Sequence, residues 1–144
     1  MEPIVIEEGF GDVPDYDIIP AGNYRAVVYK GEVRTAGEDA KHPKSQYIAW
    51  EFNILTEGYE KRKQWTNTSL VPEARGLLKR FLKGVGYTDE ELNTQGFTLD
   101  IDEIVGRECM LSVRVTDSEQ YGKQNKVQRV MPLGELSELA GDLP

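Results

Sequence analysis

A polar, glycine-containing stretch late in the chain interleaves an aromatic ring with several cations. Tyr121 and Lys123 flank the glycine, and Lys126 and Arg129 follow shortly after. An exposed ring can stack on an unpaired base, the cations can hold phosphates, and the glycine permits close approach. The same residues also fit an ordinary turn whose bases keep an edge strand soluble. We favour the binding interpretation because the loop at 35–45 is also long and basic.

Two more groups of aromatic and basic residues lie earlier in the chain. Alternation along a predicted strand places Lys61, Lys63 and Trp65 on one face. Trp65 fits either a stacking platform beside phosphate contacts or a core residue whose neighbours turn outward at the strand end. Tyr47 begins the preceding strand beside the basic loop that contains Lys44, where a stacking role fits.

The strand after that loop shows the clearest alternation of the chain. Its even positions are apolar and should face the core, namely Ile48, Trp50, Phe52 and Ile54. The odd positions should face outward. We therefore interpret Trp50 as a packing residue rather than a platform for bases.

The sequence lacks the residue sets that common catalytic sites need. His42 is the single histidine, which excludes a His-rich metal site and a Ser–His nucleophile pair, and Cys109 has no histidine near it in sequence. No phosphate-cradling glycine loop or dinucleotide fingerprint occurs. Helix capping and solvated charge explain an acidic cluster better than a nuclease-type Mg²⁺ site; the cluster is Asp100, Asp102, Glu103 and Glu108. We expect no enzymatic activity, no cofactor and no metal site.

The elements that position these residues follow a defined order. Three strand-like runs come first, an amphipathic helix follows, and two more strand-like runs come last. The expected ranges are 22–34, 46–56 and 59–69 for the early strands, 72–85 for the helix, and 107–116 and 123–131 for the late strands. This order predicts a mainly β protein, a five-stranded Greek-key OB-fold barrel with one main helix between strands three and four. Such barrels often bind single-stranded nucleic acid or oligosaccharide, which favours binding over catalysis.

The predicted helix carries one apolar stripe at helical spacing. The stripe consists of Ala74, Leu77, Leu78, Phe81, Leu82 and Val85. Its opposite face holds Arg75, Lys79, Arg80 and Lys83, which we interpret as a solvated face rather than a phosphate track. Just after the helix, Thr88 and Glu91 have the spacing of a capping box that opens a short helix.

Charge is distributed unevenly along the chain. The net charge is −8, yet residues 1–19 hold six acids and no base, and residues 130–144 hold three acids and no base. The remaining 16 acids and all 17 bases lie in residues 20–129, which have a net charge of +1. Because local patches matter more than the total, the overall acidity does not exclude a nucleic-acid partner.

Composition and charge together divide the chain into three parts. We expect an acidic N-terminal segment at 1–19, an OB-fold domain at 20–133 and an acidic C-terminal tail at 134–144. The tail fits a short docked helix, a protein-interaction tail or a frayed acidic end, and we favour the last. One cysteine precludes an internal disulfide, and no apolar run approaches the ~20 residues of a membrane span. With no signal-peptide pattern at the start, we expect a cytoplasmic protein.

Short motifs spread over most of the body resemble one protein family. They are Pro20-Ala-Gly-Asn-Tyr24, Tyr47 with Phe52-Asn-Ile54, Gly58 with Arg62-Lys63 and Trp65, Leu78 with Phe81, Asp102-Glu-Ile-Val-Gly106, and Tyr121-Gly122 with Asn125-Lys-Val127. The chain resembles a family of small bacteriophage proteins, long described only as of unknown function, that is associated with phage single-stranded-DNA-binding proteins. Lys61 stands where that family often has a glycine. The resemblance implies an OB-fold protein that coats single-stranded DNA in phage DNA replication or recombination.

The sequence therefore predicts non-catalytic, sequence-tolerant binding of single-stranded DNA by base stacking and phosphate contacts. The predicted binding residues are Lys44, Tyr47, Lys61, Lys63, Trp65, Arg114, Tyr121, Lys123, Lys126 and Arg129. The alternative is an OB-fold protein-interaction module that binds a host or phage protein. Replication or recombination proteins are expected partners of the acidic tail, a membrane is not expected, and a homodimer stays open. For a phage-encoded protein the expected location is the host cytoplasm.

Overall fold

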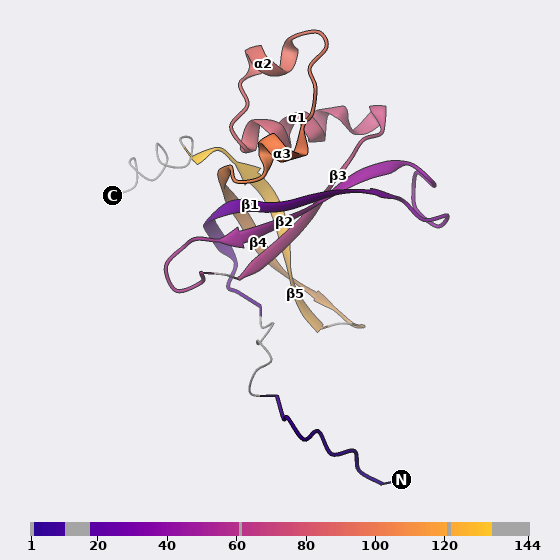
Figure 1. The fold of residues 1–144 in the computed structure, drawn as a ribbon, viewed down its shortest axis with the longest axis vertical. Coiled ribbons are helices and arrows are strands. Elements are labelled where there is room, and N and C mark those ends of the chain that lie inside the picture. Colours follow the sequence, from indigo (N-terminus) through magenta and orange to yellow (C-terminus); the bar gives the residue numbers. More distant parts are fainter. Residues whose placement is uncertain (1, 11–17, 61, 121, 134–144) are drawn as a thin grey trace.

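The fold is one open sheet of five antiparallel strands with short helices along one end (Figure 1). The structure is a computed structural model, and it describes residues 2–10, 18–60, 62–120 and 122–133. The strands are β1 (Gly22–Thr35), β2 (Gln46–Ile54), β3 (Lys63–Ser69), β4 (Glu108–Ser118) and β5 (Gly122–Met131). The helices are η1 (Pro72–Ala74), α1 (Arg75–Gly84), α2 (Asp89–Asn93) and α3 (Ile101–Ile104). The mainly β class and the place of the helix between the third and fourth strands are confirmed.

β1 is the central strand on which the sheet is built. The strand order is β3-β2-β1-β4-β5, so β3 and β5 form the two edges. β1 pairs with β2 from Ala26 to Thr35 and with β4 from Gly22 to Val27. β1 has 14 residues, so its first part can pair with β4 while most of its length pairs with β2. The register with β2 shifts between Val28 and Lys30, which marks a bulge at Tyr29.

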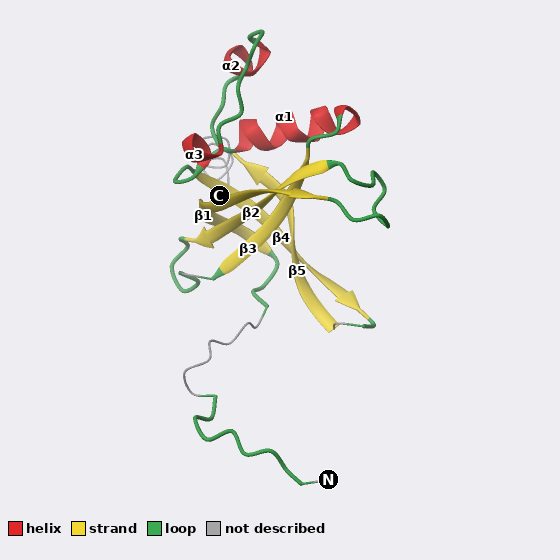
Figure 2. Ribbon diagram, turned by 45° about the vertical axis from the view of Figure 1, so that its right-hand side comes forward, coloured by secondary structure: helices red, strands yellow, loops and turns green. Residues whose placement is uncertain are grey.

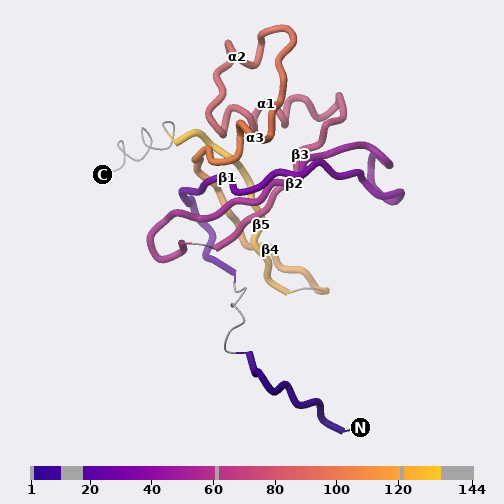
Figure 3. The backbone as a smooth tube through the Cα atoms, viewed as in Figure 1, coloured from indigo at the N-terminus to yellow at the C-terminus, as the bar shows by residue number. Residues whose placement is uncertain are grey.

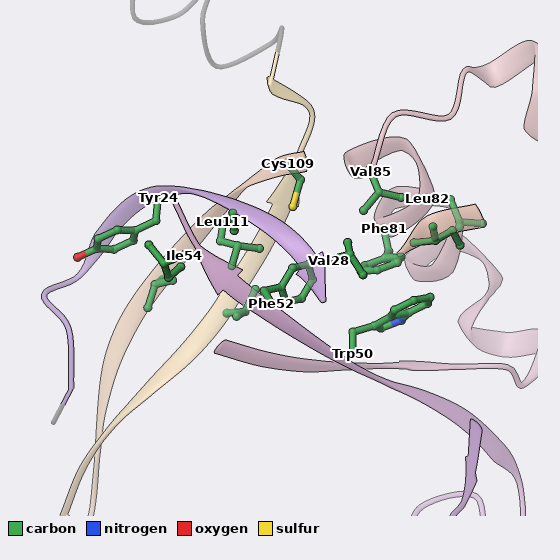
Figure 4. Close-up of a cluster of buried hydrophobic side chains, with 14 of the residues drawn as sticks. Tyr24, Val28, Trp50, Phe52, Ile54, Phe81, Leu82, Val85, Cys109 and Leu111 are labelled. Atoms are coloured by element: carbon green, nitrogen blue, oxygen red, sulfur yellow. The ribbon is translucent and has the colours of Figure 1, made fainter. Parts of the chain in front are cut away.

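The core lies between the inner face of the sheet and the helices (Figure 4). Trp50 is 1% exposed, and its ring stacks on Phe81 of α1 at a centroid distance of 4.8 Å. Its Nε1–H donates to Thr68 Oγ1 at 2.9 Å, so the one polar atom of the indole is paired. The prediction that Trp50 is a packing residue is confirmed. Cys109 is also fully buried, and burial raises the pKa of its thiol to about 12.

Gly31 has a packing role in this core. A Cβ atom at Gly31 would lie 2.6 Å from Cζ3 of Trp50 and 2.9 Å from Cγ2 of Ile101. The bulge of β1 falls two residues before Gly31, at Tyr29. Gly31 is instead the position where bare backbone makes room for the indole ring.

The helix stripe is buried over only part of its length. Phe81, Leu82 and Val85 are buried, whereas Leu77 is 67% exposed, so its assignment to the buried stripe is wrong. The reason is positional: the first turns of α1 lie beside the sheet edges β3 and β5, where Leu77 lines a groove instead of the core. Farther along, the predicted capping box of α2 is present between Thr88 and Glu91. Figure 3 traces the segment carrying α2 as it projects away from the sheet.

The start of the folded body is fixed against β5. Ile19 is 1% exposed, its N–H donates to Asn125 Oδ1 at 2.8 Å, and its carbonyl oxygen accepts from Asn125 Nδ2 at 2.8 Å. A predicted domain boundary near residue 20 fits this anchor. Of the predicted tails, residues 11–17 and 134–144 lie outside the described residues.

Replacing Gly31 with alanine should overpack the core because Trp50 cannot move away from the new methyl group. We expect G31A to lower the free energy of unfolding by about 1–3 kcal/mol, measured by urea denaturation. Gly37 provides the control, since a Cβ there meets nothing within 4 Å. Equal stability of G31A and G37A would show that the packing at Trp50 is looser than described.

Candidate nucleic-acid interface

The outer face of β2 and β3 presents a solvent-exposed tryptophan. Trp65 is 56% exposed and lies directly opposite Glu51 in the β2–β3 register. Its indole N–H donates to Glu51 Oε1 at 3.0 Å, which fixes the edge of the ring while its surface stays open to solvent. Of the two interpretations that the sequence left open for Trp65, the core position is excluded. An exposed, oriented ring is the geometry that base stacking needs.

Lys63 lies beside this ring and is held by three groups. Its Nζ lies 3.0 Å from Glu51 Oε2, 3.1 Å from Asn53 Oδ1 and 4.2 Å from the centroid of the Tyr29 ring. Tyr29 is itself 54% exposed. Alternation with the buried Val28 turns Tyr29 toward this surface. Its contact with Lys63 could not be read from the sequence because it joins β1 and β3, which flank β2 on either side.

Glu51 holds these side chains together. Burial alone would raise the pKa of its carboxyl, but hydrogen bonds from Lys63 and Trp65 and the nearby charge of Lys30 outweigh burial. The pKa of Glu51 therefore lies below its ordinary value. Its negative charge is balanced by Lys63, so a phosphate that approaches Trp65 does not meet an unpaired carboxylate.

The β1–β2 hairpin continues this face toward its loop. Tyr47 is half-buried and lies opposite Arg34 in the register. Two backbone hydrogen bonds close the loop: the Ala36 N–H donates to the Ser45 carbonyl oxygen, and the Lys44 N–H donates to the Ala36 carbonyl oxygen. Lys44 is exposed with a φ of 60°. Arg34 was not predicted as a binding residue, although its position across from Tyr47 adds a cation to this end of the sheet.

The β4–β5 hairpin carries the second set of cations. Arg114 lies opposite Lys126, and Lys123 lies opposite Asp117, all four residues being exposed. Alternation with the buried Val113 places Arg114 on the outer face of the sheet. In Figures 1 and 2 the β1–β2 hairpin extends to the right of the sheet, and the β4–β5 hairpin extends downward, away from the helices.

Arg129 has a different setting from the other predicted cations. It lines a groove of about 310 Å³ between β3, α1 and β5, together with Arg80 of α1. A neighbouring hollow of about 350 Å³ is lined in part by Lys79 and Lys83. Both lysines form ion pairs with Asp89. The basic face of α1, interpreted from sequence as solvated, thus borders a hollow beside β5.

The predicted site residues therefore fall into three groups. Tyr47, Lys63 and Trp65 share the outer face of β2 and β3, and Lys44 lies in the adjoining loop. Arg114, Lys123 and Lys126 of the β4–β5 hairpin form the second group. Arg129, which lies in the groove beside α1, forms the third. Lys61 and Tyr121 lie outside the described residues.

The acidic residues considered for Mg²⁺ have other partners. Asp100 caps α3 by accepting from the Asp102 N–H at 3.0 Å, Glu103 pairs with Arg107 at 3.2 Å, and Glu108 pairs with Arg25. Within the described ranges, no group of three or more His, Cys, Asp or Glu residues is placed to hold a metal ion. Nor does any helix described there combine the length and apolarity needed to cross a membrane.

Comparison with known proteins assigns no family. No protein-family model matches the sequence, and no curated protein sequence matches it significantly. The function of this chain is therefore inferred from its own geometry.

The Glu51–Lys63 pair predicts a specific pH dependence of stability. Because its folded-state pKa is lowered, charged Glu51 contributes stability above the unfolded glutamate pKa of ~4.3. This contribution is lost as pH falls through the lower folded-state pKa. At pH ~7, the free energy of unfolding of E51Q should be about 0.2–1 kcal/mol lower than that of wild type, the range measured for exposed ion pairs. This difference should vanish at a pH below the folded-state pKa of Glu51.

Urea denaturation across this pH range checks the prediction, and the exposed Glu57 supplies the matched variant E57Q. E57Q should show no such pH-dependent difference from wild type. A gap between wild type and E51Q that stays constant into acid would contradict the assigned role of the Glu51 charge.

Proposed function

We propose that this protein is a non-catalytic, sequence-tolerant single-stranded-DNA-binding protein. The observation that carries the proposal is the exposed Trp65 ring, fixed by Glu51, whose carboxylate also binds Lys63 beside the exposed Tyr29. A stacking surface beside a neutralised carboxylate can take an unpaired base without repelling its phosphate. Stacking tolerates any base because every base has a flat face, so the proposal includes no preference for a particular sequence.

We infer that the sheet corresponds to an OB-type barrel. Its order, with β1 between β2 and β4, becomes that of the barrel if the edges β3 and β5 are brought together. Residues of β3 and β5 come within 8 Å of each other at their Cα atoms, which supports this inference. In such barrels the ligand crosses the outer face of strands two and three, between the β1–β2 and β4–β5 loops. Trp65 and Tyr47 lie on that face.

Phosphate contacts would come from the two hairpins. Lys44 is available from the β1–β2 loop, and Arg114, Lys123 and Lys126 are available from the β4–β5 hairpin. All four are exposed, so they can adjust to a flexible backbone. The net charge of +1 for residues 20–129 leaves the body without the repulsion that the whole-chain charge of −8 suggests.

The proposal also includes a biological role for DNA binding. The resemblance described above suggests a role in phage DNA replication or recombination, in the host cytoplasm. Partner proteins would be recruited through the acidic residues at 134–144, which lie outside the described residues.

Removing the Trp65 ring should weaken DNA binding strongly. Stacking contributes roughly 1–3 kcal/mol per base, so W65A should bind oligo-dT about 5- to 150-fold more weakly than wild type. Fluorescence anisotropy of a labelled oligo-dT at low salt measures this. Because Trp65 is exposed, the variant should stay folded, which thermal melting checks.

Val105 supplies a control for W65A. It is 39% exposed and follows α3, away from the outer face of β2 and β3, so V105A removes exposed apolar surface elsewhere and should leave affinity unchanged. If folded wild-type protein fails to bind oligo-dT at low salt, the proposal is wrong and the protein-interaction module becomes the better assignment.

Salt dependence tests the hairpin cations separately from the stacking ring. Each phosphate contact to a single strand contributes about 0.7 to the slope of log affinity against log salt. The double variant K123Q/K126Q should therefore reduce the slope by about 1.4. The control R75Q removes an exposed charge from α1 and should not change it. An unchanged slope in the double variant would remove the β4–β5 hairpin from the binding surface.

A further inference from the structure

Near the start of the chain lies a segment whose apolar side chains are left exposed by the described part of the fold. Residues 2–10 form an arm in which Ile4 is 85% exposed and Val5 is 80% exposed. Phe10, at its end, is also exposed. The arm contains three acids, Glu2, Glu7 and Glu8, and no base. Isolated exposed apolar residues are ordinary, but several together with β-branched side chains mark a contact surface.

The body carries a groove with complementary properties. It occupies about 310 Å³ between the edges β3 and β5 and the first turns of α1. Leu77, Phe81 and Val127 contribute apolar surface, and Arg80 and Arg129 contribute positive charge. None of the described residues that line it is acidic. Leu77 is 67% exposed, an unusual position for a leucine on a helix face that points toward a sheet.

The groove also lies at an opening of the sheet. β3 and β5 are the two edges of the sheet, and the groove lies between these edges and α1. The side chains of a segment that crosses this opening can enter the hollow. The arm has the apolar residues for the hollow and the acids for its two arginines.

We propose that the groove of one copy binds residues 2–10 of a second copy, and that two copies exchange arms in a dimer. The occupant is argued from charge and polarity: an acidic, apolar arm and a basic, apolar groove occur in one chain, and neither has a partner within the described residues. The arm does not occupy the groove of its own chain, since Ile4 and Val5 are exposed. Reciprocal exchange between two copies closes the assembly and leaves no arm unpaired.

The point of attachment supports this arrangement. The body begins at Ile19, which two hydrogen bonds of 2.8 Å hold against Asn125 of β5. Val127, two residues farther along the same strand, lines the groove. The chain that leads from the arm therefore joins the body on β5, one of the strands that border the groove.

Sedimentation equilibrium of the full chain over the micromolar range tests the proposal. Wild type should show a reversible monomer–dimer equilibrium. V5D in the arm and L77D in the groove should each raise the dimer dissociation constant at least about tenfold, as loss of a central contact does. V33D places the same charge at an exposed residue of β1 outside the groove and should leave the constant unchanged. Thermal melts confirm that each variant is folded.

Mixing V5D with L77D provides a stricter test. V5D keeps an intact groove and L77D keeps an intact arm, so a mixed dimer has one intact contact and the mixture should dimerise more than either variant alone. A wild-type chain that stays monomeric at every concentration, dimers unaffected by V5D and L77D, or a mixture that dimerises no more than the separate variants would each overturn the proposal.

This inference is independent of DNA binding. A monomeric wild type whose oligo-dT affinity falls on introduction of L77D would assign the groove to nucleic acid and contradict arm exchange. A dimer that fails to bind oligo-dT would leave arm exchange standing and overturn the proposed function.

Discussion

The packing of Trp50 against Phe81 and the bare backbone of Gly31 is the constraint on which the rest of the structure depends. This contact joins the sheet to α1 and fixes which face of β2 is internal. Because side chains alternate along a strand, burying Trp50 directs Glu51 outward. Glu51 then meets Trp65 and Lys63 across the β2–β3 register, and the candidate binding surface is a consequence of how the core is filled.

The two tryptophans show how neighbouring strands assign opposite roles to one side-chain type. Trp50 has its indole N–H paired with Thr68 inside the protein, and its ring is covered by Phe81. Trp65 has its N–H paired with a carboxylate at the surface, and its ring stays uncovered. An exposed tryptophan loses the stabilisation that burial provides. Its fixed orientation beside Lys63 is what distinguishes it from an apolar residue exposed by chance.

Local patterns predicted the elements well because they depend on residues close in sequence. The alternation around Trp50 and the capping box at Thr88 both appear as expected. Features set by distant partners could not be read in this way. The exposure of Leu77 depends on where α1 crosses the sheet edges, and the contact of Tyr29 with Lys63 depends on β1 and β3 lying on either side of β2. Arg129 similarly meets α1 only through the tertiary fold.

The central claim is that Trp65, and not Trp50, contacts single-stranded DNA. The most direct measurement follows the two indole N–H resonances in ¹H–¹⁵N correlation spectra during titration with oligo-dT at low salt. The structure predicts that the Trp65 resonance shifts and saturates, while the Trp50 resonance, whose N–H is bonded to Thr68, stays in place. A saturating titration that leaves the Trp65 resonance unmoved would contradict the claim.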